Sequence, residues 1–392
     1  MAHSESTWFQ RLLLPGFAFK AVVIGGGYAT GRELATFFLP SGPRGGLCGM
    51  LLAMLIWSAV CVVTFLFALR TNSRDYRTFF RHLLGPLWPA FEVAYFLALM
   101  VILAVYAAAA GAIGQALFAW PAFMGAVCLV FAITLVATWG NEGVERLFKY
   151  VSFFLYATYA LFVVLSLARF GGRTLSAFAA SPATGWATGG LTYAGYNIIG
   201  AIVILPVVRH LMSARDAVVA GLLAGPLAMI PAMLFFICMV AYYPDIQNQA
   251  LPSDFLLERL NIPAFRMVFQ GMIFAALLES GTGGVHAINE RIAQAYRGKG
   301  DRVLARSARL GITAIVLTGS VFVAARFGLV SLIAGGYRWL AYAFLTIYVL
   351  PLMTFGLWRV LRRGAAASPG DCGAQAKVVD AVGPSEPFIG VP

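Results

Sequence analysis

Four glycines and two charged residues interrupt the first long apolar run of this sequence, between Ile24 and Glu33. In hydrocarbon, backbone N–H and C=O groups without helical partners survive only where protein buries them or where they line a cavity. The ends of a broken helix carry partial charges that suit a carboxylate at one end and a cation at the other. The spacing therefore predicts a site for a small solute, with backbone from Gly25, Gly26 and Gly27 and a hydroxyl from Thr30.

A second apolar run, 186–208, is interrupted at its centre by small and polar residues. We expect the helix to unwind around 193–197, where Tyr193, Tyr196 and Asn197 would supply donors and acceptors. Paired interruptions in two halves of a membrane protein indicate a solute site near the bilayer midplane. Small residues also allow close helix packing, which is the alternative interpretation.

Three more residues have chemistry that suits this site. Tyr106 lies in an alanine-rich stretch, which indicates either tight packing or room for a ligand. Arg32 and Glu33 directly follow the glycine segment. We expect this pair of charges to gate the outer side of the site.

The run 264–290 contains Glu279, Ser280 and Thr282 near its centre. A charged residue at the bilayer centre costs about 2.5–3.5 kcal/mol on insertion scales, so Glu279 should face a cavity or a partner. Two roles remain open for Glu279: it pairs with Arg32, or it carries a coupling proton. Ser280 and Thr282 are candidates for ion coupling.

The composition identifies the class of protein. Apolar residues make up 60% of the chain and charged residues 11%, with a mean hydropathy of +0.82, whereas soluble domains carry about 25% charged residues. A soluble chain of 392 residues could not bury this much apolar surface. The five cysteines show no metal-ligand spacing, and no nucleophile–base arrangement or phosphate-binding loop occurs. We therefore expect neither an enzyme nor a resident metal or cofactor.

Apolar runs between charged or Pro/Gly residues predict an all-α polytopic membrane protein with ten transmembrane helices. The predicted spans are 13–39, 46–69, 90–118, 121–139, 148–169, 186–208, 217–243, 264–290, 307–325 and 329–358. Because five spans fall in each half, we expect an inverted 5+5 repeat in which helices one and six are discontinuous. The predicted parts are a cytoplasmic N-terminus 1–12, a first repeat 13–170, an outer connection 171–185, a second repeat 186–360 and a disordered cytoplasmic tail 361–392.

Basic residues are distributed unevenly over the connections. With the N-terminus inside, 20 of the 28 Lys and Arg residues lie on the inner side, seven on the outer side and Arg32 within the first span. This bias predicts a multi-pass membrane protein with both termini in the cytoplasm. Contacts with membrane lipids explain the net charge of +12, so no nucleic-acid partner is expected. On the outer side, 247–262 is expected to form a short amphipathic helix.

The segment 25–33, together with 279–284 and 289–292, resembles the YkvI-type membrane proteins. They are a bacterial branch of the amino acid–polyamine–organocation superfamily, so the resemblance implies a location in the bacterial cytoplasmic (inner) membrane. The resemblance implies the LeuT-type fold, with a solute site between helices one, three, six and eight. It also implies a sodium site joining first-helix carbonyls to the Ser280 and Thr282 hydroxyls. The family more often has a neutral amide where this chain has Arg32.

Together these features predict a secondary active transporter that works by alternating access. The expected solute is small and polar, an amino acid or a related zwitterion, and the expected coupling ion is Na⁺ or H⁺. The alternative is a membrane receptor of the same fold, which binds a small ligand without transporting it. A channel is disfavoured because paired helix breaks indicate an occluded site instead of a continuous pore.

Overall fold

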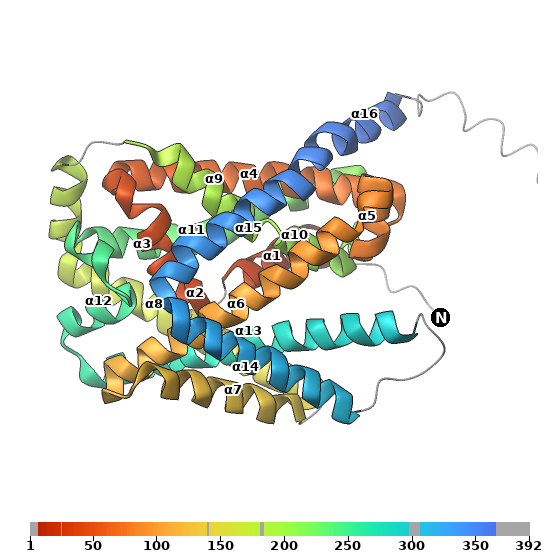
Figure 1. Cartoon of the computed structure of the whole chain (residues 1–392). Coiled ribbons are helices and arrows are strands. Elements are labelled where there is room, and N and C mark those ends of the chain that lie inside the picture. The colour runs from red at the N-terminus through yellow and green to blue at the C-terminus, as the bar shows by residue number, and fades with distance from the viewer. Residues whose placement is uncertain (1–6, 25, 139–140, 181–183, 298–305, 366–392) are drawn as a thin grey trace, which may run out of the picture.

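The structure is a computed structural model that describes the whole chain except residues 1–6, 25, 139–140, 181–183, 298–305 and 366–392. The regular elements of the described residues are all helices (Figure 1). In the first half they are α1 (Leu14–Val23), α2 (Gly26–Ala29), α3 (Arg32–Phe37), α4 (Gly42–Thr71), α5 (Tyr76–Leu84), α6 (Pro89–Phe118), α7 (Ala122–Thr138) and α8 (Asn141–Ala180). In the second half they are α9 (Trp186–Asn197), α10 (Gly200–Val203), α11 (Ala214–Val240), α12 (Pro252–Leu260), α13 (Pro263–Arg297), α14 (Arg306–Ser331), α15 (Tyr337–Phe344) and α16 (Leu357–Ala365). The 3-10 turns η4 (Leu205–His210) and η5 (Asp245–Asn248) lie before and after α11.

Five stretches of the described residues are long and apolar enough to cross a membrane. They are 32–71, 89–118, 153–179, 214–240 and 308–362. The last is much longer than the roughly 20 residues of one crossing, and it bends at Gly328, where φ is 73°. This bend lies between the two last predicted spans. The all-α membrane class is confirmed, while the total of ten crossings stays a prediction.

The first helix is discontinuous, as predicted. α1 ends at Val23, Ile24 leaves the helical conformation with φ −80° and ψ 70°, and Gly31 adopts φ 77° before α3 begins. A Cβ atom on Gly31 would lie 2.5 Å from the Phe235 ring. Both the left-handed conformation and the close contact therefore require glycine here.

The sixth helix is also discontinuous, but it breaks later than predicted. Residues 193–197 form the end of α9, and the break lies at 198–199, before α10 begins at Gly200. The small residues serve packing instead, because a Cβ atom on Gly195 would lie 3.0 Å from Leu345. A pattern of small residues suits both unwinding and close packing. In 193–197 it marks close packing.

Two connections also differ from their predicted form. The predicted outer connection 171–185 is helical as far as Ala180, because α8 continues through Gly171 and Gly172. Glycine lowers helix propensity by about 1 kcal/mol without forbidding the helix. Helix α16 likewise extends to Ala365, into the predicted tail.

Two short helices lie in connections at opposite ends of the bundle. The connection 70–89 contains α5, whose first turn is capped by the Asp75 carboxylate, which accepts a hydrogen bond from the Thr78 N–H. The amphipathic helix expected within 247–262 is confirmed as α12.

The two helix breaks lie side by side near the middle of the bundle (Figure 1). After the second break, a Cβ atom on Gly200 would lie 3.1 Å from Phe19 and 3.3 Å from Val22 of α1. Before it, the Tyr196 hydroxyl donates a hydrogen bond to Glu33 of α3. The halves of the broken helices therefore pair crosswise, α1 with α10 and α3 with α9.

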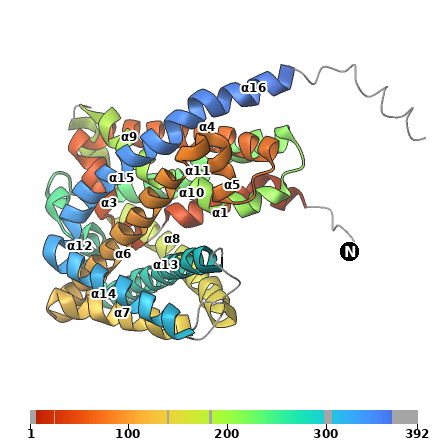
Figure 2. The same ribbon diagram turned by 45° about the vertical axis from the view of Figure 1, so that its right-hand side comes forward.

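The long helices form two groups around these breaks (Figure 1 and Figure 2). The first group contains α1, α4, α9, α10 and α11, and the second group contains α6, α7, α8, α13 and α14. Both ends of the described chain lie at one end of the bundle, beside α5, which we call the terminal face. The opposite end carries α12 and is called the distal face. Which face is cytoplasmic stays a prediction.

Candidate functional site

A buried carboxyl group, that of Glu33, lies at the centre of the candidate site. Glu33 is in the first turn of α3 and is 5% exposed. Its Oε2 accepts a hydrogen bond of 2.5 Å from the Tyr196 hydroxyl at the end of α9. Tyr337 of α15 stacks on Tyr196 with ring centroids 4.4 Å apart. The sequence predicts a gating role for Glu33, whereas the structure places it between the two helix breaks.

Tyr193 lies one turn earlier on α9 and is fully buried. Its ring packs edge-on against Tyr196, with centroids 5.6 Å apart, and against Phe38 at 4.8 Å. Its hydroxyl has no hydrogen-bond partner among the described residues. Buried polar atoms in proteins usually have a hydrogen-bond partner, so this hydroxyl is available to a polar group of a solute. The third predicted residue of this helix, Asn197, donates its amide to the Tyr193 carbonyl and so ends the helix.

The glycine segment contributes backbone to the same region. Gly25 lies outside the described residues, and α2, which begins with Gly26 and Gly27, contacts α6 and α13. Thr30 contacts the distal end of the bundle, where its carbonyl accepts a hydrogen bond of 3.0 Å from the Ser253 N–H. Helices one, three and eight therefore meet here, as the resemblance implies.

The predicted residues of helices three and eight are only partly brought together. Tyr106 is buried on α6 and its hydroxyl meets the Ser280 side chain of α13. The Thr282 hydroxyl donates to the Leu278 carbonyl of its own helix at 2.7 Å. One hydroxyl thus faces Tyr106 and the other faces backbone. A sodium site built from Ser280 and Thr282 stays a prediction.

Glu279 and Arg32 contact different parts of the molecule. Glu279 is half-buried and lies on the side of α13 that interacts with Tyr156 of α8. Arg32 instead donates from Nη1 to the carbonyls of Gln247 and Gln249, at 2.9 and 2.7 Å. An ion pair between Glu279 and Arg32 is not among the contacts that the structure describes for these two residues.

The distal face is closed by hydrogen bonds between α3 and the loop before α12. Besides the two bonds to the loop carbonyls, the Arg32 Nε donates to Thr36 at 3.1 Å. Helix α12 is itself fixed to α13: Asp254 accepts hydrogen bonds from Arg266 at 2.8 and 2.7 Å and from Gln270 at 2.7 Å. The predicted gating residue Arg32 therefore lies where a gate on this side would be.

The terminal face has a cavity of about 460 Å³ between the two helix groups. Ile202 and Pro206, which follow the second helix break, line one side. Tyr95 of α6 and Arg291 of α13 line the other. The cavity begins directly after the break in helix six, so it is a suitable approach to the centre from this face.

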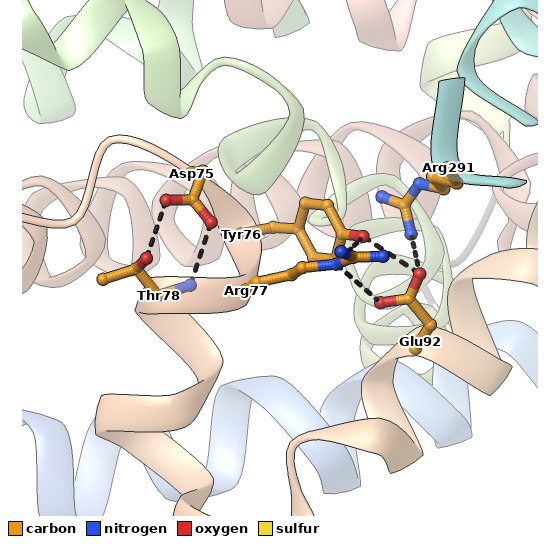
Figure 3. Close-up of polar contacts among 6 residues, drawn as sticks. All are labelled: Asp75, Tyr76, Arg77, Thr78, Glu92 and Arg291. Carbon is orange, nitrogen blue, oxygen red and sulfur yellow. Dashed lines mark hydrogen bonds and ion pairs between the residues drawn. The ribbon is translucent and has the colours of Figure 1, made fainter. Parts of the chain in front are cut away.

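A network of charged and aromatic side chains borders this cavity (Figure 3). The Tyr76 hydroxyl of α5 donates to Glu92 Oε1 at 2.9 Å, and the Arg291 Nη1 lies 3.4 Å from the same oxygen. The Arg291 guanidinium lies over the Tyr76 and Tyr95 rings, 3.9 and 3.6 Å from their centroids. Burial raises the pKa of Tyr76, so its hydroxyl keeps the proton that it donates.

Sequence reasoning missed this network and the central position of Glu33. Glu92 is the one acidic residue of the predicted third span, and a carboxyl so placed is a signal for a polar partner. That signal identifies no partner, because Arg291 is 199 residues away in the chain.

Solved membrane transporters have a similar architecture. The manganese transporter of Eremococcus coleocola, in complex with an aromatic bis-isothiourea substituted compound, matches with a TM-score of 0.53 and 19% identity over 90% of this chain and 80% of that one. A mutant of the same transporter matches with a TM-score of 0.51 and 17% identity over the same shares. MhsT in complex with L-phenylalanine matches with a TM-score of 0.53 and 16% identity over 94% of this chain and 100% of MhsT. No family model and no curated protein matches the chain.

These matches show that the chain has the LeuT-type fold. The discontinuous first and sixth helices and the two helix groups belong to that architecture. At these identities the likeness concerns the fold and leaves the solute and the ion open.

Proposed function

We propose that this protein is a secondary active transporter that moves a small polar organic solute by alternating access. The observation that carries the proposal is the pairing of the two helix breaks around Glu33 and Tyr196. Broken helices in a membrane offer free backbone groups to a solute. Because α1 pairs with α10 and α3 pairs with α9, the free backbone groups of both breaks would line one solute site.

The different states of the two faces support alternating access. Arg32 and the loop before α12 are joined by hydrogen bonds at the distal face, where a cavity of about 240 Å³ borders the same loop. The cavity at the terminal face is larger, about 460 Å³, and borders α10. A transporter needs a conformation that is closed on one side and accessible from the other. We propose that the terminal face is cytoplasmic, as the distribution of basic residues predicts.

The proposed solute is an amino acid or a related zwitterion. Free N–H groups at a helix break suit its carboxylate, and the faces of the buried tyrosine rings suit an ammonium group. The resemblance of the glycine segment to YkvI-type proteins points to the same class.

Uptake of radiolabelled amino acids into proteoliposomes tests the proposal, with imposed sodium or pH gradients in separate arms. Accumulation above the outside concentration in either arm supports transport and identifies the coupling ion. Binding without accumulation in both arms would instead establish the receptor.

The same substitution at two glycines, Gly200 beside the second break and Gly319 away from it, tests the site, with Gly319 as the control. Leucine at Gly200 would enter the contact with Phe19 and Val22, whereas Gly319 is exposed with no atom within 4 Å of its Cβ position. Overpacking costs about 1–3 kcal/mol. We expect Gly200→Leu to abolish uptake and Gly319→Leu to preserve it, with both proteins inserted in the membrane.

A further inference from the structure

The Glu33 carboxyl is buried without a countercharge among the described residues. Its neighbour Arg32 directs its guanidinium to the carbonyls of Gln247 and Gln249. The ion pairs of the described residues involve Asp216, Glu92, Asp254 and Glu258. An unneutralised carboxylate in such a place costs several kcal/mol. The group must therefore hold a proton or a cation for much of the time.

The titratable groups that face Glu33 are tyrosines from four elements. Tyr196 donates directly to the carboxyl. Four other tyrosines interact with Glu33 electrostatically: Tyr28 of α2, Tyr106 of α6, Tyr193 of α9 and Tyr337 of α15. Of the acidic residues on the remaining elements packed on α3, Asp254 and Glu258 of α12 both pair with Arg266, and Asp245 of η5 is exposed. The surroundings thus offer hydrogen bonds without positive charge.

The packing favours a proton over a larger cation at this position. The rings of Tyr196 and Tyr337 are stacked, and Phe37 lies against Tyr196 with centroids 5.7 Å apart. A metal ion would need several oxygen ligands, whereas the hydrogen bond described for this carboxyl comes from Tyr196 alone. The Tyr193 hydroxyl is buried, has no hydrogen-bond partner among the described residues and interacts electrostatically with Glu33.

We propose that Glu33 carries the coupling proton of the transport cycle and that Tyr196 links its protonation to the helix breaks. This rests on the proposed function. A proton from water at one face binds the carboxylate and gives a neutral carboxyl. When the other face opens, the same O–H bond breaks and the proton leaves to water there, with no group oxidised or reduced. Tyr196 lies two residues before the break at 198–199, so movement of that break changes the hydrogen bond that the carboxyl receives.

Infrared difference spectroscopy of the purified protein between acidic and basic pH tests the proton site without any solute. We expect the C=O band of a protonated carboxyl in the wild type and in Glu279→Gln, and its loss in Glu33→Gln. The amide of Glu33→Gln has the shape of the neutral acid, so this variant should fold, as size-exclusion chromatography will show. An undiminished band in Glu33→Gln, or loss of the band in Glu279→Gln instead, would overturn the assignment.

Proteoliposome uptake with a mixture of carbon-14-labelled proteinogenic amino acids tests the coupling. We expect Glu33→Gln to lose pH-gradient-driven accumulation by about tenfold or more and to keep exchange at equal pH. Tyr196→Phe should lose part of the accumulation, and Glu258→Gln, at an exposed carboxylate of α12, should keep it. Accumulation at the wild-type level in Glu33→Gln contradicts the proposal. If the wild type transports nothing, the proposed function fails, and the infrared result still decides whether Glu33 is a proton site.

Discussion

The two faces of the bundle differ in the chemistry of their polar contacts. At the distal face, Arg32 donates to main-chain carbonyls at 247 and 249, and the Ser253 N–H donates to the Thr30 carbonyl. At the terminal face, the contacts around Glu92 and Arg291 join side chains beside an open cavity. A main-chain carbonyl carries no full charge, whereas the attraction between two ionised side chains that reach solvent is screened by salt. Salt should therefore weaken the contact of Arg291 with Glu92 more than the contacts of Arg32 with the loop carbonyls.

The largest effect on stability is expected for Asp254→Ala at the distal face. The change removes three hydrogen bonds and leaves the part-buried Arg266 without its main partner. Breaking a buried ion pair costs about 3–5 kcal/mol, and the partial exposure of Arg266 places the loss at the lower end. Thermal unfolding in detergent, followed by tryptophan fluorescence, should show a clear drop in Tm. An unchanged Tm would mean that α12 is not held by this pair.

Arg32→Ala should open the distal face with a smaller loss of stability. The carbonyls released here gain access to water, so their new hydrogen bonds to water offset most of the loss, whereas Asp254→Ala leaves a part-buried charge without its partner. The readout is an impermeant maleimide on Ser253→Cys, a buried position, in a background without other cysteines. We expect labelling to rise about tenfold. Arg44→Ala, an exposed arginine in the first turn of α4, is the control and should leave labelling low.

Arg291→Ala should have a moderate effect that depends on salt. It removes the ion pair with Glu92 and two ring contacts, each worth about 0.5–2 kcal/mol. Uptake should fall several-fold at low ionic strength and approach the wild type at high ionic strength, where the wild-type contact is itself weakened. Arg291→Lys keeps the charge and loses the planar stacking on the two rings. Its uptake at low ionic strength should therefore lie between that of the wild type and that of Arg291→Ala. If the loss of uptake in Arg291→Ala does not vary with salt, the ion pair with Glu92 is not what makes Arg291 important.

The smallest effect is expected for Glu258→Gln. Glu258 lies 3.0 Å from the same Arg266 as Asp254 does, but its side chain is 53% exposed. Exposed pairs contribute about 0–1 kcal/mol, so Tm should stay close to the wild type. A drop as large as that of Asp254→Ala would show that burial is not what separates these two carboxylates.

The membrane class and the break in helix one follow from the sequence, because four glycines and two charges inside an apolar run are hard to place in a regular membrane helix. The break in helix six was predicted too early. Gly195 makes a close contact with Leu345, 150 positions along the chain, and only the fold shows which small residues serve such contacts. The same holds for α8, which continues through Gly171 and Gly172.

The sequence predicted which residues contribute to the candidate site better than it predicted where each of them lies. Tyr193 and Tyr196 lie at the centre as expected, and Arg32 lies at the distal face. Glu33 was expected at the gate with Arg32, yet neighbouring residues on a helix point about 100° apart. One reaches the loop before α12 and the other reaches α9. Which of two adjacent charges turns inward depends on the orientation of α3, which composition does not determine.

The way in which Arg32 is held has a consequence for how this protein diverges among species. Its acceptors at 247 and 249 are main-chain oxygens, which every amino acid provides. Mutations that replace Gln247 or Gln249 leave the acceptors in place as long as the loop keeps its path. Among orthologues that keep an arginine at position 32, we therefore expect a loop that varies in residue type and stays constant in length.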